Sequence, residues 1–145
     1  MTPGGAAERG GLDDAGDLHA GLRAWARGRF PLEAATELLI RAGFARAQDP
    51  WVRREPAGAS RSDAVWVDFA AVSAFVEPLS AGERRLLLFA ASLSGVDEAP
   101  AVRLGELTSV EPGRLALLVA ALAHAGGRYD VWRTAPAATS SPTRS

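Results

Sequence analysis

The sequence predicts a mainly α protein, a compact bundle of about five helices with disordered N- and C-terminal tails. Three observations support this prediction: apolar residues recur at the helical period, a capping box precedes one apolar stretch, and both ends are rich in small residues. The chain has 145 residues, 48% of them apolar, which suits one domain with its own core. We therefore expect tails at 1–15 and 134–145 around a single helical domain at 16–133.

Two helices are expected at the start of this domain. Asp17 is a suitable N-cap for the first. Pro31 fits the first position of the second, where a missing N–H matters least, and Gly43 fits its C-terminal cap. The second helix also pairs Glu37 with Arg41 at a spacing of four. The inward face of the first helix is expected to carry Leu18, Leu22 and Trp25.

The segment 44–63 is predicted to be a long irregular loop, because it contains Pro50, Pro56 and Gly58. The stretch "AVWVDF" after it alternates in the manner of a short strand, but a single strand would have no partner. We instead expect extended chain that leads into a helix capped by Asp68.

A capping box marks the next helix. Ser80 and Glu83 have the S-x-x-E spacing ahead of an apolar run, so the serine oxygen accepts a first-turn N–H and the glutamate accepts the serine N–H. Gly95 is expected to end the helix. The run at 81–93 is apolar over most of its circumference, which is typical of a central, buried helix.

The same stretch resembles part of an ABC-type ATPase, with "LSAGE" in the position of the signature loop and "VDEAP" after a Walker B strand. The chemistry argues against this, because the nucleotide needs a P-loop lysine and the chain has no lysine. Asp97 also follows a predicted helix end and not an apolar strand. We therefore interpret the motif as a capping box.

A last long helix is predicted from Pro112 to the glycines at 126–127, after a short helical turn around Leu104 and Leu107. It is almost entirely apolar, and the helix at 81–93 is apolar over most of its circumference. We expect these two helices to contact each other at the centre of the bundle.

The closing segment resembles the helix–turn–helix part of MarR-like winged-helix regulators. "LGELTS" would be the first helix, "EPGRLALLVAALAHAGG" the recognition helix and "RYDVWRT" the wing, which implies a DNA-associated regulator. A recognition helix must present polar and basic side chains to the groove, however, and this one offers little besides Arg114 before His124. Two stretches, "LHAGLRAWARG…EAATELLIRAG" and "LALLVAALAHAGG", also resemble parts of small uncharacterised actinobacterial helical proteins, a resemblance that implies no activity.

The composition excludes several kinds of chemistry. All 16 basic residues are arginine and there is no cysteine, so Schiff-base lysines, thiol nucleophiles and cysteine zinc sites are absent. An enzyme that needs histidine would have to use His19 or His124, and the sequence places no partner beside either. We expect no catalytic residue, no metal site and no cofactor.

One loop cluster is a candidate binding surface. Trp51 lies beside Arg53 and Arg54 between two prolines, and Trp and Arg are enriched where proteins bind one another. The alternative is a Trp that packs onto the core among solvated arginines. We predict Trp51, Arg53 and Arg54 as partner-binding residues.

The function predicted from these observations is a non-catalytic protein-interaction module, an adaptor or regulatory subunit that binds a protein partner or itself. A DNA-associated regulator and an enzyme are the alternatives; a salt-dependent shift of duplex DNA would favour the first, and a pocket holding His19 or His124 beside a carboxylate the second. The net charge of -1 argues against nucleic acid as a partner. No apolar run suits a bilayer, and we expect the cytoplasm as the location.

Overall fold

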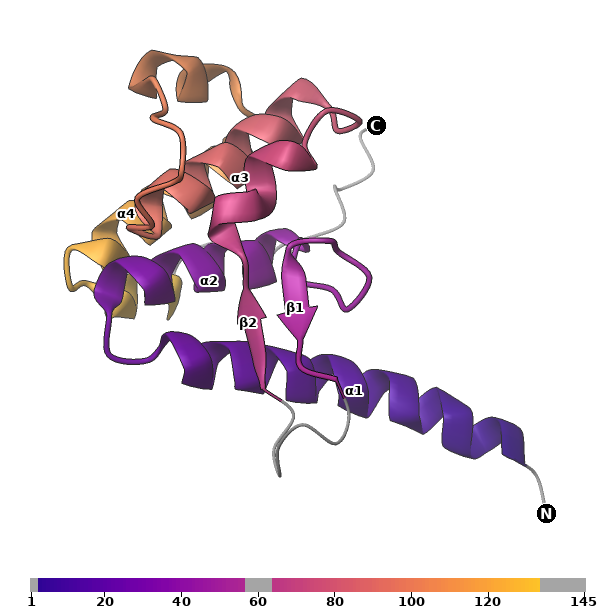
Figure 1. The fold of residues 1–145 in the computed structure, drawn as a ribbon. Coiled ribbons are helices and arrows are strands. Elements are labelled where there is room, and N and C mark those ends of the chain that lie inside the picture. Colours follow the sequence, from indigo (N-terminus) through magenta and orange to yellow (C-terminus); the bar gives the residue numbers. More distant parts are fainter. Residues whose placement is uncertain (1–2, 57–63, 134–145) are drawn as a thin grey trace, which may run out of the picture.

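The computed structural model describes residues 3–56 and 64–133, and it is mainly helical (Figure 1). Four α-helices and three 3-10 helices surround one small hairpin within the described residues. The α-helices are α1 (Pro3–Ala26), α2 (Phe30–Ala42), α3 (Ala81–Leu93) and α4 (Pro112–Ala125). The 3-10 helices are η1 (Phe69–Ala74), η2 (Leu104–Ser109) and η3 (Tyr129–Arg133), and the strands are β1 (Val52–Arg54) and β2 (Val65–Val67). The predicted fold class is confirmed; the predicted tail at 134–145 lies outside the described residues.

Helix α2 is the centre of the bundle. It packs against α1, α3 and α4, and its buried side chains lie on more than one face. Pro31 stands in its first turn, one residue later than predicted because the helix begins at Phe30, and Gly43 ends it as predicted, in the left-handed conformation with φ of 85°. Its buried residues are Leu32, Ala34, Ala35, Thr36, Leu38, Leu39 and Ile40.

Helices α3 and α4 contact each other, as the sequence predicts, but they do not form the centre. Both helices pack against α2, and α2 is the central helix of the bundle. The sequence prediction went wrong because α2 carries charges, whereas α3 and α4 are more uniformly apolar in their middle turns. The charges of α2 fall on a narrow stripe and leave the rest of its circumference free to be buried.

Helix α1 begins at Pro3, so the predicted start at Asp17 and the predicted tail before it differ from the structure. No proline interrupts the chain between Pro3 and the end of the helix, and a proline in the first turn suits a helix start. Leu18 and Leu22 are buried as expected, whereas Trp25 is 36% exposed. Ala26, and not Trp25, completes the inward face of α1.

The hairpin corrects the prediction of extended chain at "AVWVDF". Strand β2 does have a partner, because β1 pairs with it antiparallel, with Val52 opposite Val67. The sequence of β1 does not show the apolar pattern of a strand, because two of its three residues are exposed arginines. Figure 1 shows the hairpin standing between α1 and the turn that leads to α3. Val65 and Val67 are buried, and β2 lies against α1.

Two predicted caps are confirmed. Asp68 caps η1, accepting the Ala71 N–H, although η1 is a 3-10 helix and ends before Phe75. Ser80 Oγ accepts the Glu83 N–H at 3.2 Å, and Glu83 Oε1 accepts the Ser80 N–H at 3.0 Å. This capping box starts α3.

We predict that Ser80→Ala lowers the free energy of unfolding by about 1 kcal/mol, because the first turn of α3 loses its cap. Chemical denaturation measures the change. Ser92→Ala on the exposed side of α3 is the control and should leave the stability within about 0.5 kcal/mol of the parent. Equal stability of the parent and Ser80→Ala would contradict a role for the capping box.

We predict opposite effects for two glycine substitutions in α1. A Cβ at Gly21 would lie 2.7 Å from Val65 Cγ2, whereas a Cβ at Gly16 would have no atom within 4 Å. Gly16→Ala should therefore stabilise the protein by about 0.5–1 kcal/mol through helix propensity. Gly21→Ala should destabilise it, because the buried valine has few rotamers to move into. Thermal melts of both variants check this, and stabilisation by Gly21→Ala would show that α1 does not approach β2 so closely.

Candidate functional site

The structure does not bring the predicted Trp51, Arg53 and Arg54 together on one surface. Trp51 is 3% exposed, and its indole N–H donates to the Phe44 carbonyl at 2.7 Å. Its ring also packs tilted against that of Phe44. The premise that Trp51 is a surface residue is therefore wrong: the chain turns back after Phe44 and carries the indole into the core.

A local ion pair explains this turn. Asp49 is buried and accepts the Arg46 N–H at 2.9 Å, while the Arg46 guanidinium lies 2.7 Å from the same carboxylate. This contact closes the loop just before Trp51. Arg53 and Arg54 remain exposed on β1, and Arg53 lies 3.4 Å from Asp68.

The two histidines have different surroundings. His19 Nε2 lies 3.2 Å from the Ala45 carbonyl oxygen, a contact that fastens α1 to the segment after α2. His124 is buried near the end of α4, at the centre of a polar cluster. No three His, Asp or Glu residues of the described chain gather where a metal ion would need them.

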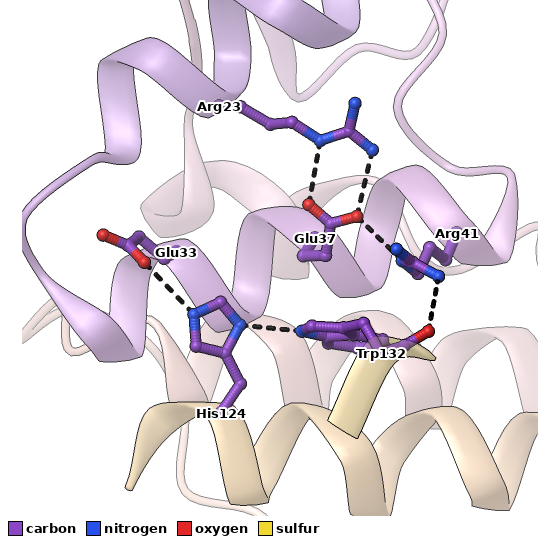
Figure 2. Close-up of polar contacts among 6 residues, drawn as sticks. All are labelled: Arg23, Glu33, Glu37, Arg41, His124 and Trp132. Atoms are coloured by element: carbon purple, nitrogen blue, oxygen red, sulfur yellow. Dashed lines mark hydrogen bonds and ion pairs between the residues drawn. The ribbon is translucent and has the colours of Figure 1, made fainter. Parts of the chain in front are cut away.

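The polar cluster is built on one stripe of α2. Glu33, Glu37 and Arg41 recur every four residues, which places them on one side of the helix. Glu37 accepts hydrogen bonds from Arg23 of α1 at 2.9 and 3.0 Å and from Arg41 at 2.8 Å (Figure 2). The sequence predicts the pair of Glu37 with Arg41, but not the bidentate bond from α1.

Trp132 joins η3 to this stripe. Its indole N–H donates to His124 Nδ1 at 2.8 Å, and its carbonyl oxygen accepts from Arg41 at 3.3 Å. The Arg41 guanidinium carbon also lies 5.0 Å from the centre of the Trp132 ring, a cation–π contact. Figure 2 shows these groups in one continuous network.

The contact with Trp132 fixes the protonation pattern of His124. An indole N–H can only donate, so Nδ1 must accept and cannot itself carry a proton. The ring hydrogen is therefore on Nε2, which faces Glu33 Oε1 at 3.1 Å. The other oxygen of Glu33 accepts the Gly28 N–H at 2.6 Å, in the turn between α1 and α2. Both ring nitrogens of His124 are thus used to hold the fold together.

A pocket of about 190 Å³ opens beside this cluster. It holds a histidine beside carboxylates, an arrangement that would favour an enzyme. The lining contains no hydroxyl or thiol that could act as a nucleophile, and the His124 lone pair is engaged by Trp132. The lining residues are Arg23, Ala26, Arg27, Glu33, Glu37 and His124.

Charge pairing dominates the electrostatics of this cluster. Burial acts to raise the pKa of Glu37, but the hydrogen bonds from Arg23 and Arg41 outweigh it and hold the pKa below its ordinary value. The hydrogen bond to Glu37 raises the pKa of Arg23 in turn. Glu37 is therefore ionised at neutral pH and serves as the anion between two guanidinium groups.

Besides the polar cluster, the side of α4 that faces away from α2 and α3 is unusual. Val119 is 60% exposed and Leu122 is 55% exposed, although they lie in the most apolar of the described α-helices. No polar residue occurs between Arg114 and His124. We call this surface the outer face of α4; it consists of the exposed Val119, Leu122 and Gly126 with the half-buried Ala116 and Ala123 beside them, whereas Leu115 is half-buried and packs against the core.

The structure departs from the winged-helix pattern. The residues that would form the wing are the 3-10 helix η3, whose Trp132 is buried against His124. The helix that would read DNA, α4, buries one side and exposes an apolar one. The described residues of the expected wing, 128–133, contain no strand, and the exposed side of α4 offers no pattern of donors and acceptors for base edges.

No protein-family model, curated protein or solved structure matched the chain in comparisons with known proteins. The predicted resemblances therefore stay predictions. In the described part of the chain, no helix combines the length and the apolar character needed to cross a bilayer.

We predict that Glu37→Gln lowers the free energy of unfolding at pH 7 by about 1–2 kcal/mol, because two arginines lose their shared counterion. The folded-state pKa of Glu37 is depressed, so its contribution is complete above the ordinary glutamate value of about 4.3 and is lost as the pH falls through the folded value. The stability difference between parent and variant should therefore shrink below about pH 4.3.

Denaturation curves at several pH values measure this difference. Glu98→Gln, at an exposed position after α3, is the matched control and should show no such pH dependence. A difference between parent and Glu37→Gln that is constant down to pH 3 would contradict the depressed pKa.

Proposed function

We propose that this chain is a non-catalytic protein-interaction module and that it binds through the outer face of α4. One observation carries the proposal: Val119 and Leu122 are 60% and 55% exposed in a helix stretch that has no polar side chain. Single exposed apolar residues are ordinary, but neighbouring ones one helical turn apart form a continuous patch.

The shape of this surface suits a helix as its occupant. Val119 and Leu122 form a ridge of large side chains, and the small side chains of Ala116 and Ala123, seven residues apart, lie together on one side of it, so a groove runs beside the ridge. Helices bind one another through such apolar stripes, with anchors spaced by three or four residues. We also propose that the protein acts in the cytoplasm.

The hairpin is a less favourable surface for this role than α4. With Trp51 buried, only Arg53 and Arg54 of the predicted binding residues are exposed, and Arg53 already faces Asp68. Exposed arginines without an apolar anchor contribute little to affinity. These two residues nevertheless provide a direct comparison for the outer face of α4.

The pocket beside His124 is the observation in favour of an enzyme. General acid–base chemistry needs a nitrogen that can exchange its proton with a substrate. Trp132 occupies Nδ1 and Glu33 faces Nε2, so a substrate would have to displace one of two internal partners. We therefore assign this cluster to holding α1, α2, α4 and η3 together.

A role in DNA binding has less support. Arg114 is the only arginine of α4, and it lies 3.8 Å from Glu83. Affinity for DNA depends on several cations that neutralise phosphates, and the net charge of the whole chain is -1. We do not expect nucleic acid as the partner.

We predict that a photo-crosslinking amino acid at position 119 forms covalent products with protein in cells of the native host, whereas the same amino acid at position 54 does not. Position 54 is the control, because Arg54 is exposed on the surface that the sequence predicts to bind. Gel electrophoresis and mass spectrometry detect the products. Crosslinked products at position 54 alone would show that the hairpin, and not α4, carries the binding surface. Products at neither position would contradict the proposal that the chain is an interaction module.

A further inference from the structure

We propose that η3 is a pH-sensitive switch: when His124 takes up a proton, its hydrogen bond with the Trp132 indole breaks and η3 is released from α4. This inference goes beyond the proposed function and does not depend on it. It rests on the two hydrogen bonds of the His124 ring, which respond to protonation in opposite ways (Figure 2).

The His124 ring is neutral in the docked state, in which Trp132 is buried against it. Nδ1 accepts the indole N–H at 2.8 Å, and Nε2 carries the ring hydrogen and faces Glu33 Oε1 at 3.1 Å. Trp132 is 8% exposed, so the indole cannot exchange this acceptor for water while η3 stays in place. A second ring proton can go only to Nδ1, because Nε2 already carries one.

Protonation of Nδ1 changes the contact with Trp132 from attractive to repulsive. Two N–H groups would then face each other across the 2.8 Å that now spans a hydrogen bond, and neither could accept. A buried donor without an acceptor is unfavourable, because it has lost its hydrogen bond to water as well. The protonated ring and the docked indole therefore exclude each other.

The contact with Glu33 responds in the opposite sense. An imidazolium keeps its Nε2–H directed at the carboxylate, and the hydrogen bond becomes charge-assisted. Glu33 is itself held by the Gly28 N–H at 2.6 Å, in the turn between α1 and α2. The ring therefore stays attached to α2 after protonation, and the element that moves is η3.

Helix η3 has few other attachments. It is five residues long and packs against α4. Arg41 holds it through the Trp132 carbonyl at 3.3 Å and through the face of the ring, and Arg41 keeps its bond to Glu37 when η3 leaves. The apolar packing of Val131 and Trp132 on the core opposes release, so this packing sets how far the pH must fall.

The charged groups on the elements around His124 are balanced by one another. The pairs are Arg23–Glu37 between α1 and α2, Arg41–Glu37 within α2, Arg114–Glu83 between α4 and α3, and Arg128–Asp130 beside η3. Arg27 of α1 is exposed and lines the same pocket as His124. Glu33 provides the carboxylate in direct contact with the ring, and it favours the imidazolium.

The direction of the pH dependence follows from the number of bound protons. The released state holds one more proton on His124 than the docked state, so acid favours release. Histidine side chains change their charge between about pH 5 and 8. We therefore expect η3 to be docked at pH 8 and increasingly released toward pH 5. The ratio of released to docked protein should rise by up to about tenfold for each pH unit.

Indole N–H resonances in two-dimensional NMR spectra between pH 8 and 5 test the switch. The Trp132 resonance should move from the position of a hydrogen-bonded indole to that of a free one. The heteronuclear NOE of the backbone at 131–133 should fall, because these residues become mobile. Trp51 is the internal control, since its indole N–H donates to a carbonyl group, which does not titrate.

Two outcomes of this titration would overturn the proposal. One is a Trp132 resonance that does not change down to pH 5. The other is a change that Trp51 shares, because it would report unfolding of the whole domain and not release of η3.

The two histidines of the chain provide a matched pair of variants. His124→Gln should abolish the pH response with η3 still docked, because a neutral amide can accept from Trp132 and donate to Glu33. His19→Gln should keep the response in full. Loss of the response in His19→Gln, or its persistence in His124→Gln, would assign the proton to another group and overturn the switch.

Trp132→Phe tests the repulsion between the two donors. It keeps an aromatic ring but removes the N–H, so a protonated Nδ1 meets no opposing donor. The heteronuclear NOE of Val131 and Arg133 should then be the same at pH 8 and pH 5. A fall as large as that of the parent would show that η3 is released for a different reason, and it would contradict the proposed mechanism.

Discussion

Helix α2 carries a single polar stripe, and the orientation of its neighbours depends on where that stripe faces. Glu37 binds Arg23 of α1 and Arg41 of its own helix, and Glu33 contacts both His124 of α4 and the turn at Gly28. A charge or a buried ring nitrogen that loses its partner destabilises a fold more than a displaced methyl group does. The stripe therefore fixes the rotation of α1 and α4 about their own axes. Apolar packing alone would allow several rotational orientations of each helix.

The exposed apolar side of α4 follows from this constraint. His124 must face α2 to reach Glu33 and Trp132, and residues two and five positions before it then lie on the far side of the helix. Those residues are Leu122 and Val119. The same contact that closes the polar cluster thus leaves an apolar surface open to solvent, and this explains why a chain with an ordinary share of apolar residues does not bury all of them. The proposed interface is a product of how the core is assembled.

Much of the fold was predictable from local signals, but the candidate site was not. Pro31, Gly43, Asp68 and the Ser80–Glu83 box act within a few residues of themselves, and the caps predicted from Gly43, Asp68 and the box are confirmed, while Pro31 stands one position later than predicted. The hairpin was missed because strand β1 is short and carries two arginines, so its pattern does not differ from that of a loop. Trp51 was misplaced because its burial depends on the turn closed by Asp49. The His124 cluster joins residues 91 positions apart in the chain, a distance at which sequence periodicity gives no information.

The central claim is that the outer face of α4 is open in the single chain and available to a protein partner. Methyl relaxation by a soluble paramagnetic probe, measured by NMR on the protein alone, tests it most directly. The methyl groups of Val119 and Leu122 should relax almost as strongly as those of Leu104, which is 71% exposed, and much more strongly than those of Leu118, which is 2% exposed. Relaxation of Val119 and Leu122 as weak as that of Leu118 would mean that the chain covers this face itself, and it would contradict the account.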